Sequence, residues 1–163
     1  MTDDVTSAER AGWAAIALDA YNEVAPAPLF PVPSTSALAH LGTVAATAYA
    51  EATRNDPADR EVHDAFSANL VIGDLIADLY HLADEQEIAA DQITEAAEEL
   101  RARSYPVQLT ALCAVAAAGA ERLAAMLAAL MESAEAFGCD VPEMVADAQA
   151  FYEDCKAEEA ISR

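Results

Sequence analysis

The stretch NLVIGDLIADLYHLADEQEI, from Asn69 to Ile88, decides the fold class of this chain. Its apolar residues recur at spacings of three and four, which is the period of an amphipathic α-helix. On a helical wheel they form one broad face, made of Val71, Ile72, Leu75, Ile76, Leu79, Leu82 and Ala83. The back of the helix then holds Gly73, Ala77, Tyr80 and Asp84. We therefore expect a long helix that packs its broad face against a core.

A polar stripe borders this apolar face, at spacings of four, three and four residues: Asp74, Asp78, His81 and Glu85. Carboxylates beside a core can be half buried and can hold a hard cation. On that interpretation Asp74 and Asp78 are candidate metal ligands, and His81 is a candidate proton carrier or ligand. The same pattern is also typical of the solvated face of a helix in an acidic protein. His81 would then be a border histidine that hydrogen-bonds to Asp78.

The composition indicates helices along the rest of the chain as well. Ala is the commonest residue, Gly occurs only 5 times in 163 residues, and runs of β-branched or aromatic residues are absent. Ala favours helices because it loses no side-chain entropy in them. A chain of this length can bury a core of its own. We predict one all-α domain over residues 1–163, built as a bundle of about six helices.

Proline, glycine and capping residues set the bounds of the expected helices. The six segments cover residues 7–24, about 35–54, 57–86, 90–103, 107–137 and 140–159. Asp56 is expected to cap the third helix, with Pro57 at its first position. Gly138 is expected to end the fifth helix in a left-handed conformation. Glu132 and Glu135, in that same helix, are expected on a solvated face.

Two parts of the chain resemble each other at an offset of 51 residues. Both DLIADLYHLADEQEIAADQITEAAEEL and AMLAALMESAEAFGCDVPEMVADAQAF predict a long helix, a short break and a shorter helix. Matching positions include Leu79 with Leu130, Ala83 with Ala134, and Ala97 with Ala148. Because Ala-rich helices resemble one another easily, internal duplication is a hypothesis at this point.

The charge excludes some partners and favours others. The chain has 29 Asp and Glu against 8 Lys and Arg, for a net charge of −21. Direct binding to nucleic acid or to an anionic membrane surface needs Lys and Arg, so neither is expected. A phosphate ligand would need an intervening cation, whereas a basic protein partner would be attracted directly. The acid excess can also serve solubility alone.

The cysteines and the start of the chain bear on location. Cys113, Cys139 and Cys155 are odd in number and show no CxxC spacing, which favours reduced thiols. The first residues, MTDDVTSAER, are acidic and polar and do not resemble a signal peptide. We therefore expect a cytoplasmic protein.

The segment GDLIADLYHLADEQEIAADQITEAAEELRARSYPV, residues 73–107, resembles the second half of a MazG-like all-α nucleoside triphosphate pyrophosphohydrolase. The motifs Gly73-Asp74, LAD at residues 82–84 and YPV at residues 105–107 fall at the places expected for that family. The resemblance implies a MazG-like core over residues 1–106, with residues 107–163 as a C-terminal helical hairpin packed on it. It also implies a homo-oligomer.

The family's magnesium site is only partly matched. The family holds Mg²⁺ with four acids from a Glu-x-x-Glu helix and a Glu-x-x-Asp helix, and Asp74 matches the last of these. The other three positions hold no acid, since they are His40, Thr43 and Val71. Val cannot supply the oxygen ligand that magnesium needs. The resemblance therefore implies a lost or modified site, or one moved to Asp74, Asp78 and Glu51.

Three functional hypotheses follow. The first is a divergent or inactive nucleoside triphosphate pyrophosphohydrolase, in which water attacks a phosphorus atom polarised by Mg²⁺. Arg101 and Arg103 match the family's basic residues before Tyr-Pro and would contact phosphate, although they can also simply complement a helix C-terminus. The second is a non-catalytic acidic helical interaction protein that docks a basic partner or mimics nucleic acid. The third is a stable acidic bundle whose partner interface is apolar, in which the Ala- and Leu-rich helix expected over residues 107–137 would favour self-association.

Overall fold

The fold of the chain is all-helical in the computed structural model, which describes residues 5–25, 34–102 and 118–162. The helices are α1 (Ser7–Val24), α2 (Thr35–Thr53), the 3₁₀ turn η1 (Pro57–Arg60), α3 (Ala65–Glu85), α4 (Ala90–Ala102), α6 (Ala118–Ala136) and α7 (Val141–Ile161). No strand occurs in these ranges. The prediction of an all-α bundle of about six helices is confirmed.

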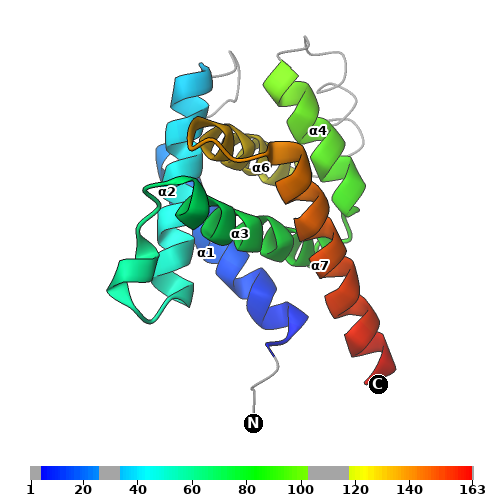
Figure 1. The fold of residues 1–163 in the computed structure, drawn as a ribbon. Helices are drawn as coiled ribbons and strands as arrows, with labels where there is room; N and C mark the ends of the chain where they lie inside the picture. The colour runs from blue at the N-terminus through cyan, green and yellow to red at the C-terminus, as the bar shows by residue number, and fades with distance from the viewer. Residues whose placement is uncertain (1–4, 26–33, 103–117, 163) are drawn as a thin grey trace.

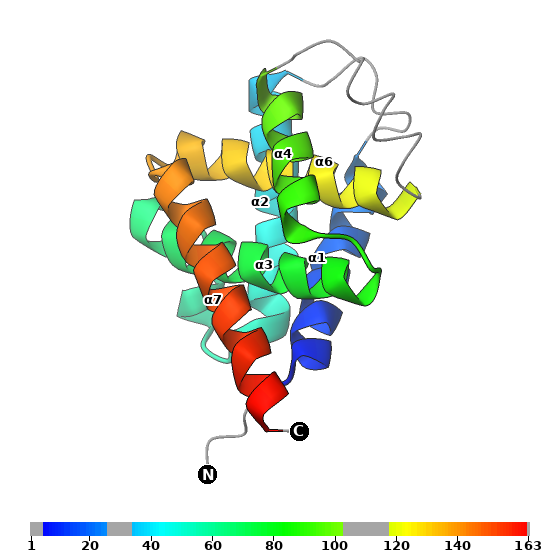
Figure 2. The same ribbon diagram turned by 90° about the vertical axis from the view of Figure 1, so that its right-hand side faces the viewer.

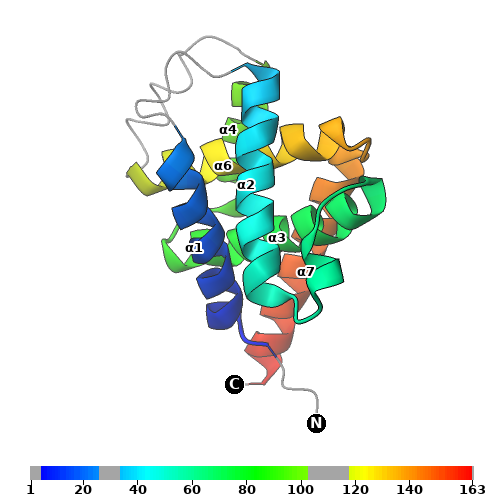
Figure 3. The ribbon, with the colours of Figure 1, turned by 90° about the vertical axis from the view of Figure 1, so that its left-hand side faces the viewer.

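The helices stack in three layers (Figure 1). α3 and α6 form the middle layer, with α4 lying across α6 and α7 lying across α3 on one side (Figure 2). α1 and α2 cover the opposite side, where α1 packs on α3 and α2 packs on α6 (Figure 3). The middle helices are therefore covered from both sides, and α6 is buried without interruption from Leu123 to Ala134.

For α3, the predicted apolar face is confirmed, whereas the predicted back and the predicted start of the helix are corrected. All seven residues of the expected apolar face of α3 are buried. Ala77 and Tyr80, which were expected at the back of the helix, are buried too, because α3 is covered on more than one side. The expected start at Pro57 is wrong. Asp56 caps only the short turn η1, and α3 begins at Ala65.

The start of α3 is fixed by its capping residue. The Asp64 side chain accepts a hydrogen bond from the Ser67 amide at 2.7 Å, and the Ser67 hydroxyl accepts one from the Asp64 amide at 3.1 Å. This reciprocal capping box satisfies amide groups that a helix start leaves unpaired. The capping box gives Asp64 an advantage over Asp56, whose side chain accepts a hydrogen bond from the Ala58 amide without a reciprocal bond in the described structure.

α2 and α6 cross at close range because both helices have small residues at the crossing, Gly42 in α2 and Ala129 in α6. A Cβ atom at Gly42 would lie 2.1 Å from the carbonyl oxygen of Ala129. One turn along α6, the hydroxyl groups of Thr43 and Ser133 are 2.8 Å apart. Glycine at this position lets the backbones of the two helices touch, so the α2–α6 contact depends on it.

The turns after α3 and α6 have the same hydrogen bonds at the offset of 51 residues. The Ile88 amide donates to the Ala83 carbonyl at 2.9 Å, and the Cys139 amide donates to the Ala134 carbonyl at 3.0 Å. Both residues of the second bond lie 51 positions after their counterparts in the first, so the two bonds are equivalent. Such a bond closes the end of a helix whose next residue is left-handed.

The left-handed residues themselves also match. Glu87 has a φ of 58° and Gly138 a φ of 88°, and these positions again differ by 51. The expected left-handed Gly138 is thus confirmed. The packing is reciprocal as well, since α3 lies on α7 and α6 lies on α4. Turn geometry and packing together support the hypothesis of internal duplication, with α3–α4 and α6–α7 as the two copies.

Two expectations reach beyond the described residues. The helix expected over 107–137 is seen as α6 from Ala118, and residues 103–117 lie outside the described ranges. The helices of the predicted C-terminal hairpin each pack on a helix of the first part of the chain, α6 on α4 and α7 on α3. Within the described residues, no helix is long and apolar enough to cross a membrane.

Candidate functional site

Asp78 lies at the meeting point of three helices. Its side chain is 1% exposed, and Oδ2 accepts a hydrogen bond from the Tyr49 hydroxyl of α2 at 2.6 Å. Oδ1 accepts one from Arg10 Nη1 of α1 at 3.2 Å. Burial raises the pKa of Asp78 to about 6, although Tyr49 and Arg10 both act to lower it. Both carboxylate oxygens of this candidate metal ligand are therefore bound by side chains of the chain itself.

Asp74 is the other candidate metal ligand and lies one turn earlier on α3. It is exposed, and its Oδ2 atom accepts a hydrogen bond from Arg54 Nη2. Glu51 and Glu85 are exposed as well. In the part of the chain that the structure describes, no three His, Cys, Asp or Glu residues are grouped so that they could hold a metal ion. The magnesium site stays a prediction.

His81 is buried in the middle of the predicted stripe. It is 1% exposed, and neither ring nitrogen has a hydrogen-bond partner in the described structure. Its ring meets Tyr152 of α7 edge-on, with the ring centroids 4.9 Å apart. Burial lowers the pKa of His81, and the Arg10 charge acts in the same direction. The expected hydrogen bond from His81 to Asp78 is wrong, because Tyr49 and Arg10 take the Asp78 oxygens.

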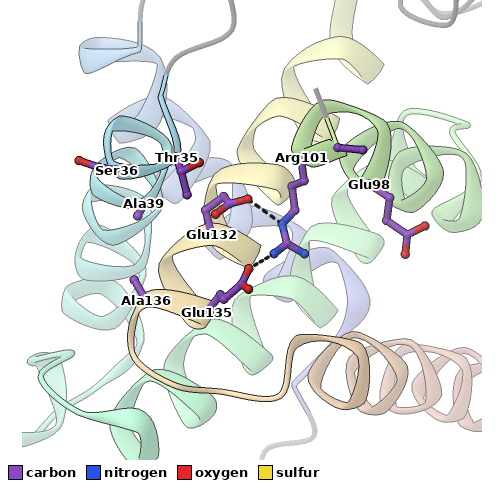
Figure 4. Close-up of a pocket in the computed structure, with 9 residues that line it drawn as sticks. Thr35, Ser36, Ala39, Glu98, Arg101, Glu132, Glu135 and Ala136 are labelled. Atoms are coloured by element: carbon purple, nitrogen blue, oxygen red, sulfur yellow. Dashed lines mark hydrogen bonds and ion pairs between the residues drawn. The ribbon is translucent and has the colours of Figure 1, made fainter. Parts of the chain in front are cut away.

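A groove opens between α2, α4 and α6 (Figure 4). It has a volume of about 850 Å³ and is lined by Thr35, Ser36, Ala39, Glu98, Arg101, Ala102, Glu132, Glu135 and Ala136. Arg101 stands at its polar centre. The Arg101 Nε atom donates to Glu132 Oε1 at 3.0 Å, and the same guanidinium binds the Glu135 carboxylate.

The groove residues depart from the expectations drawn for them. Glu132 was expected on a solvated face but is 7% exposed, because α4 covers it and supplies Arg101 as its partner. Glu135 is exposed as expected. Arg101, the candidate phosphate contact, binds these two carboxylates, and Arg103 lies outside the described residues. The burial of Glu132 had a signal in the sequence, because this Glu-x-x-Glu pair directly follows a long apolar run.

The groove pair and the His81 pair occupy equivalent places in the two copies. Glu132 and Tyr152 lie 51 positions after His81 and Arg101, so the His81–Tyr152 contact corresponds to the Glu132–Arg101 ion pair. In both copies a buried residue of the middle layer meets a side chain of the helix that crosses it. On the duplication hypothesis, equivalent positions of the two copies therefore carry two different chemistries.

Four of the six Lys and Arg residues in the described ranges form ion pairs within the chain. Arg10, Arg54, Arg101 and Lys156 each form an ion pair with at least one carboxylate of the chain. The carboxylates so paired are Asp74, Asp78, Asp84, Glu132 and Glu135, which are five of the 27 acids in the described ranges. Exposed acids of α7 add to the surface charge, at Glu143, Asp147, Glu153, Asp154 and Glu158. The described surface is therefore strongly negative.

Comparison with protein-family models, with curated proteins and with solved structures found no match for this chain. The resemblance to MazG-like hydrolases consequently rests on the motifs in residues 73–107. The homo-oligomer and the cytoplasmic location likewise stay predictions.

Proposed function

We propose that this protein is a non-catalytic acidic helical protein that docks a basic partner. One observation carries the proposal: in the described residues four of the six Arg and Lys side chains, Arg101 among them, form ion pairs with the chain's own acids, which leaves a large surplus of exposed carboxylates. A surface of one sign attracts a partner of the opposite sign and speeds their encounter. A Lys- or Arg-rich segment of another protein fits this surface.

The alternative hydrolase function draws less support from the same contacts. A nucleoside triphosphate is itself anionic and needs a bound cation and free guanidinium groups near its phosphates. Asp78 is bound by Tyr49 and Arg10, and Arg101 is bound by Glu132 and Glu135. Nucleotide hydrolysis would require these buried or half-buried pairs to be broken first. Docking of a basic partner requires no such rearrangement.

The proposal is tested by the binding of a short peptide that alternates Lys with Ala, measured by calorimetry on the full chain. The dissociation constant should rise steeply as salt goes from about 0.1 M to about 1 M, because the Debye length then falls from about 10 Å to about 3 Å. A peptide with Glu in place of Lys is the matched control and should not bind. Lack of salt dependence, or equal binding of both peptides, would overturn the proposal.

Calorimetry with Mg²⁺ or Mn²⁺ separates the two functions. The docking proposal expects no micromolar metal binding by the wild-type chain. Micromolar binding that is lost in Asp74→Ala, followed by pyrophosphate release from a nucleoside triphosphate, would establish the hydrolase instead. Asp74 is suited to this test because it is exposed, so its substitution should leave the core intact.

A further inference from the structure

The first helix, α1, is apolar on its outer side as well as towards the core. Its buried side is made of Ala11, Ala14, Ala17 and Tyr21. A second apolar set recurs at spacings of three, four and four residues and therefore shares another face, the α1 stripe: Trp13, Ile16, Ala20 and Val24. Ile16 is 46% exposed and Val24 is 51% exposed. A helix that is apolar on more than one side is normally covered on each of them.

The described helices leave the α1 stripe open. α1 lies in an outer layer and packs mainly on α2 and α3 (Figure 3). Gly12, one turn before Ile16, is exposed, and a Cβ atom added to it would meet no atom within 4 Å. Glycine is less favourable than alanine in a helix, and no neighbour within the described structure requires it here. A glycine in such a place lets another backbone approach closely, as Gly42 does for α6.

Acids border the α1 stripe. Glu9 lies four residues before Trp13, and Glu23 lies seven residues after Ile16, so the two continue the same face at its ends. Asp19 lies beside Ile16, three residues further along the helix. All three acids are exposed. An apolar centre with a charged rim is the usual composition of a protein–protein interface.

We propose that the α1 stripe docks an amphipathic helix of the basic partner, whose apolar side chains lie on Ile16 and Val24 and whose Lys or Arg side chains reach the bordering acids. This inference rests on the proposed function and names its site. From Trp13 to Val24 the stripe runs for about 17 Å, at about 1.5 Å per residue. That length matches about three turns of a partner helix with anchors at spacings of three and four.

Charge decides between this partner and a second copy of the chain. Arg10 is the one basic residue of α1, and Asp78 binds it. Two copies of α1 packed face to face would bring the Glu9 and Glu23 ends of one copy beside acids of the other, in the parallel and in the antiparallel arrangement. Like charges placed opposite each other disfavour such a pair. A basic helix meets the same acids with opposite charge.

The first test uses an amphipathic peptide of about four turns, with Leu at spacings of three and four and with Lys and Ala at its other positions. A scrambled peptide has the same composition, but its Leu residues do not share a face. In calorimetry on the full chain, the amphipathic peptide should bind about 5- to 10-fold more tightly, because only it can bury its Leu side chains on the stripe. The amide shifts that it induces should centre on Trp13, Ile16 and Ala20.

Two matched pairs of substitutions locate the site. Ile16→Gln removes an apolar side chain from the stripe, and Leu70→Gln removes one of nearly equal exposure, 49%, from α3. The first should weaken the amphipathic peptide about 5- to 10-fold and the second less than about 1.5-fold. Asp19→Asn should weaken it about 2- to 5-fold, whereas Asp147→Asn, at an exposed position of α7, should weaken it less than about 1.5-fold. All four positions are exposed, and circular dichroism establishes that each variant is folded before binding is measured.

The outcomes separate the site from the function. Equal binding of the amphipathic and scrambled peptides, or equal effects of Ile16→Gln and Leu70→Gln, would overturn the α1 site, and salt-dependent binding by the wild type would then leave docking by the general surface. No binding of any Lys-containing peptide by the wild type would overturn both proposals. A dimer in sedimentation that is lost in Ile16→Gln would assign the stripe to a second copy of the chain instead.

Discussion

Tyr49 and Asp78 are joined by a hydrogen bond of 2.6 Å that crosses from α2 to α3. Arg10 reaches the other carboxylate oxygen from α1, so one buried acid ties three helices together. Members of such a network depend on one another, because removing one partner leaves a charge buried with fewer bonds.

Tyr49→Phe is expected to lower the free energy of unfolding by about 1.5–3 kcal/mol, the usual contribution of a hydrogen bond to a charged group. Tyr21→Phe is the matched control. The Tyr21 hydroxyl is buried and has no hydrogen-bond partner in the described structure, so its loss should cost less than about 0.5 kcal/mol. Urea denaturation of the three proteins checks this. Equal losses for both variants would show that the Tyr49–Asp78 bond does not stabilise the fold.

The pH dependence of stability should carry a contribution from Asp78. Its pKa is about 6 in the folded chain against 3.8 for the free side chain, because burial disfavours the charged form. A raised pKa stabilises the fold below pH 3.8, and this contribution is lost as the pH rises through about 6. Between pH 7 and pH 5 the wild type should gain about 1 kcal/mol relative to Asp78→Asn, which does not titrate. Parallel stability profiles for the two proteins would contradict the raised pKa.

His81 should act in the opposite sense. Burial lowers its pKa below 6.5, so its contribution to stability is present above pH 6.5 and is lost as the pH falls. His81→Leu has no imidazole to protonate. The free energy of unfolding of this variant should therefore fall less than that of the wild type between pH 7 and pH 5. Denaturation at the two pH values measures the difference. A variant that loses as much stability as the wild type would assign the acid sensitivity to other groups.

The sequence predicted the positions of the helices better than the contacts between them. The period of the apolar residues identified α3 and its buried face, and Gly138 marked the end of α6. These features follow from local chemistry. The start of α3 was misplaced because Asp56 and Asp64 are both able to cap a helix, and only the full set of bonds around Ser67 separates them.

The polar residues show why the site was harder to predict. Asp74 and Asp78 are alike on the helical wheel, yet Asp74 is exposed and Asp78 is buried, since Arg10 of α1 and Tyr49 of α2 cover Asp78. Which helix covers which face depends on contacts between distant parts of the chain. In the same way, Glu132 lies beside Arg101 because α4 crosses α6, and the Glu-x-x-Glu spacing alone does not contain that information.

Gly42→Ala should be strongly destabilising. Its Cβ would lie 2.1 Å from the Ala129 carbonyl oxygen, so α2 and α6 would have to move apart. The cost of such overpacking is about 1–3 kcal/mol or more. Gly73→Ala is the control, because its Cβ would meet only Met144 Cγ at an ordinary 3.9 Å. That substitution should stabilise the helix by about 0.5–1 kcal/mol. Melting temperatures that fall for Gly42→Ala and rise for Gly73→Ala would agree with the close crossing, and an unchanged Gly42→Ala would contradict it.

The two left-handed turn residues allow a test of the duplicated framework. Glu87 and Gly138 hold equivalent positions, but only Gly138 adopts its positive φ without steric cost. Glu87→Gly should therefore raise the free energy of unfolding by up to about 1 kcal/mol, and Gly138→Ala should lower it by about 1 kcal/mol. If the turns are equivalent, the double variant should come close to the wild type, because the sites are distant and their effects add. Urea denaturation of the single and double variants measures all three values. A Glu87→Gly variant less stable than the wild type would show that the turn after α3 is held by its side chain, and the equivalence would then be limited to the backbone.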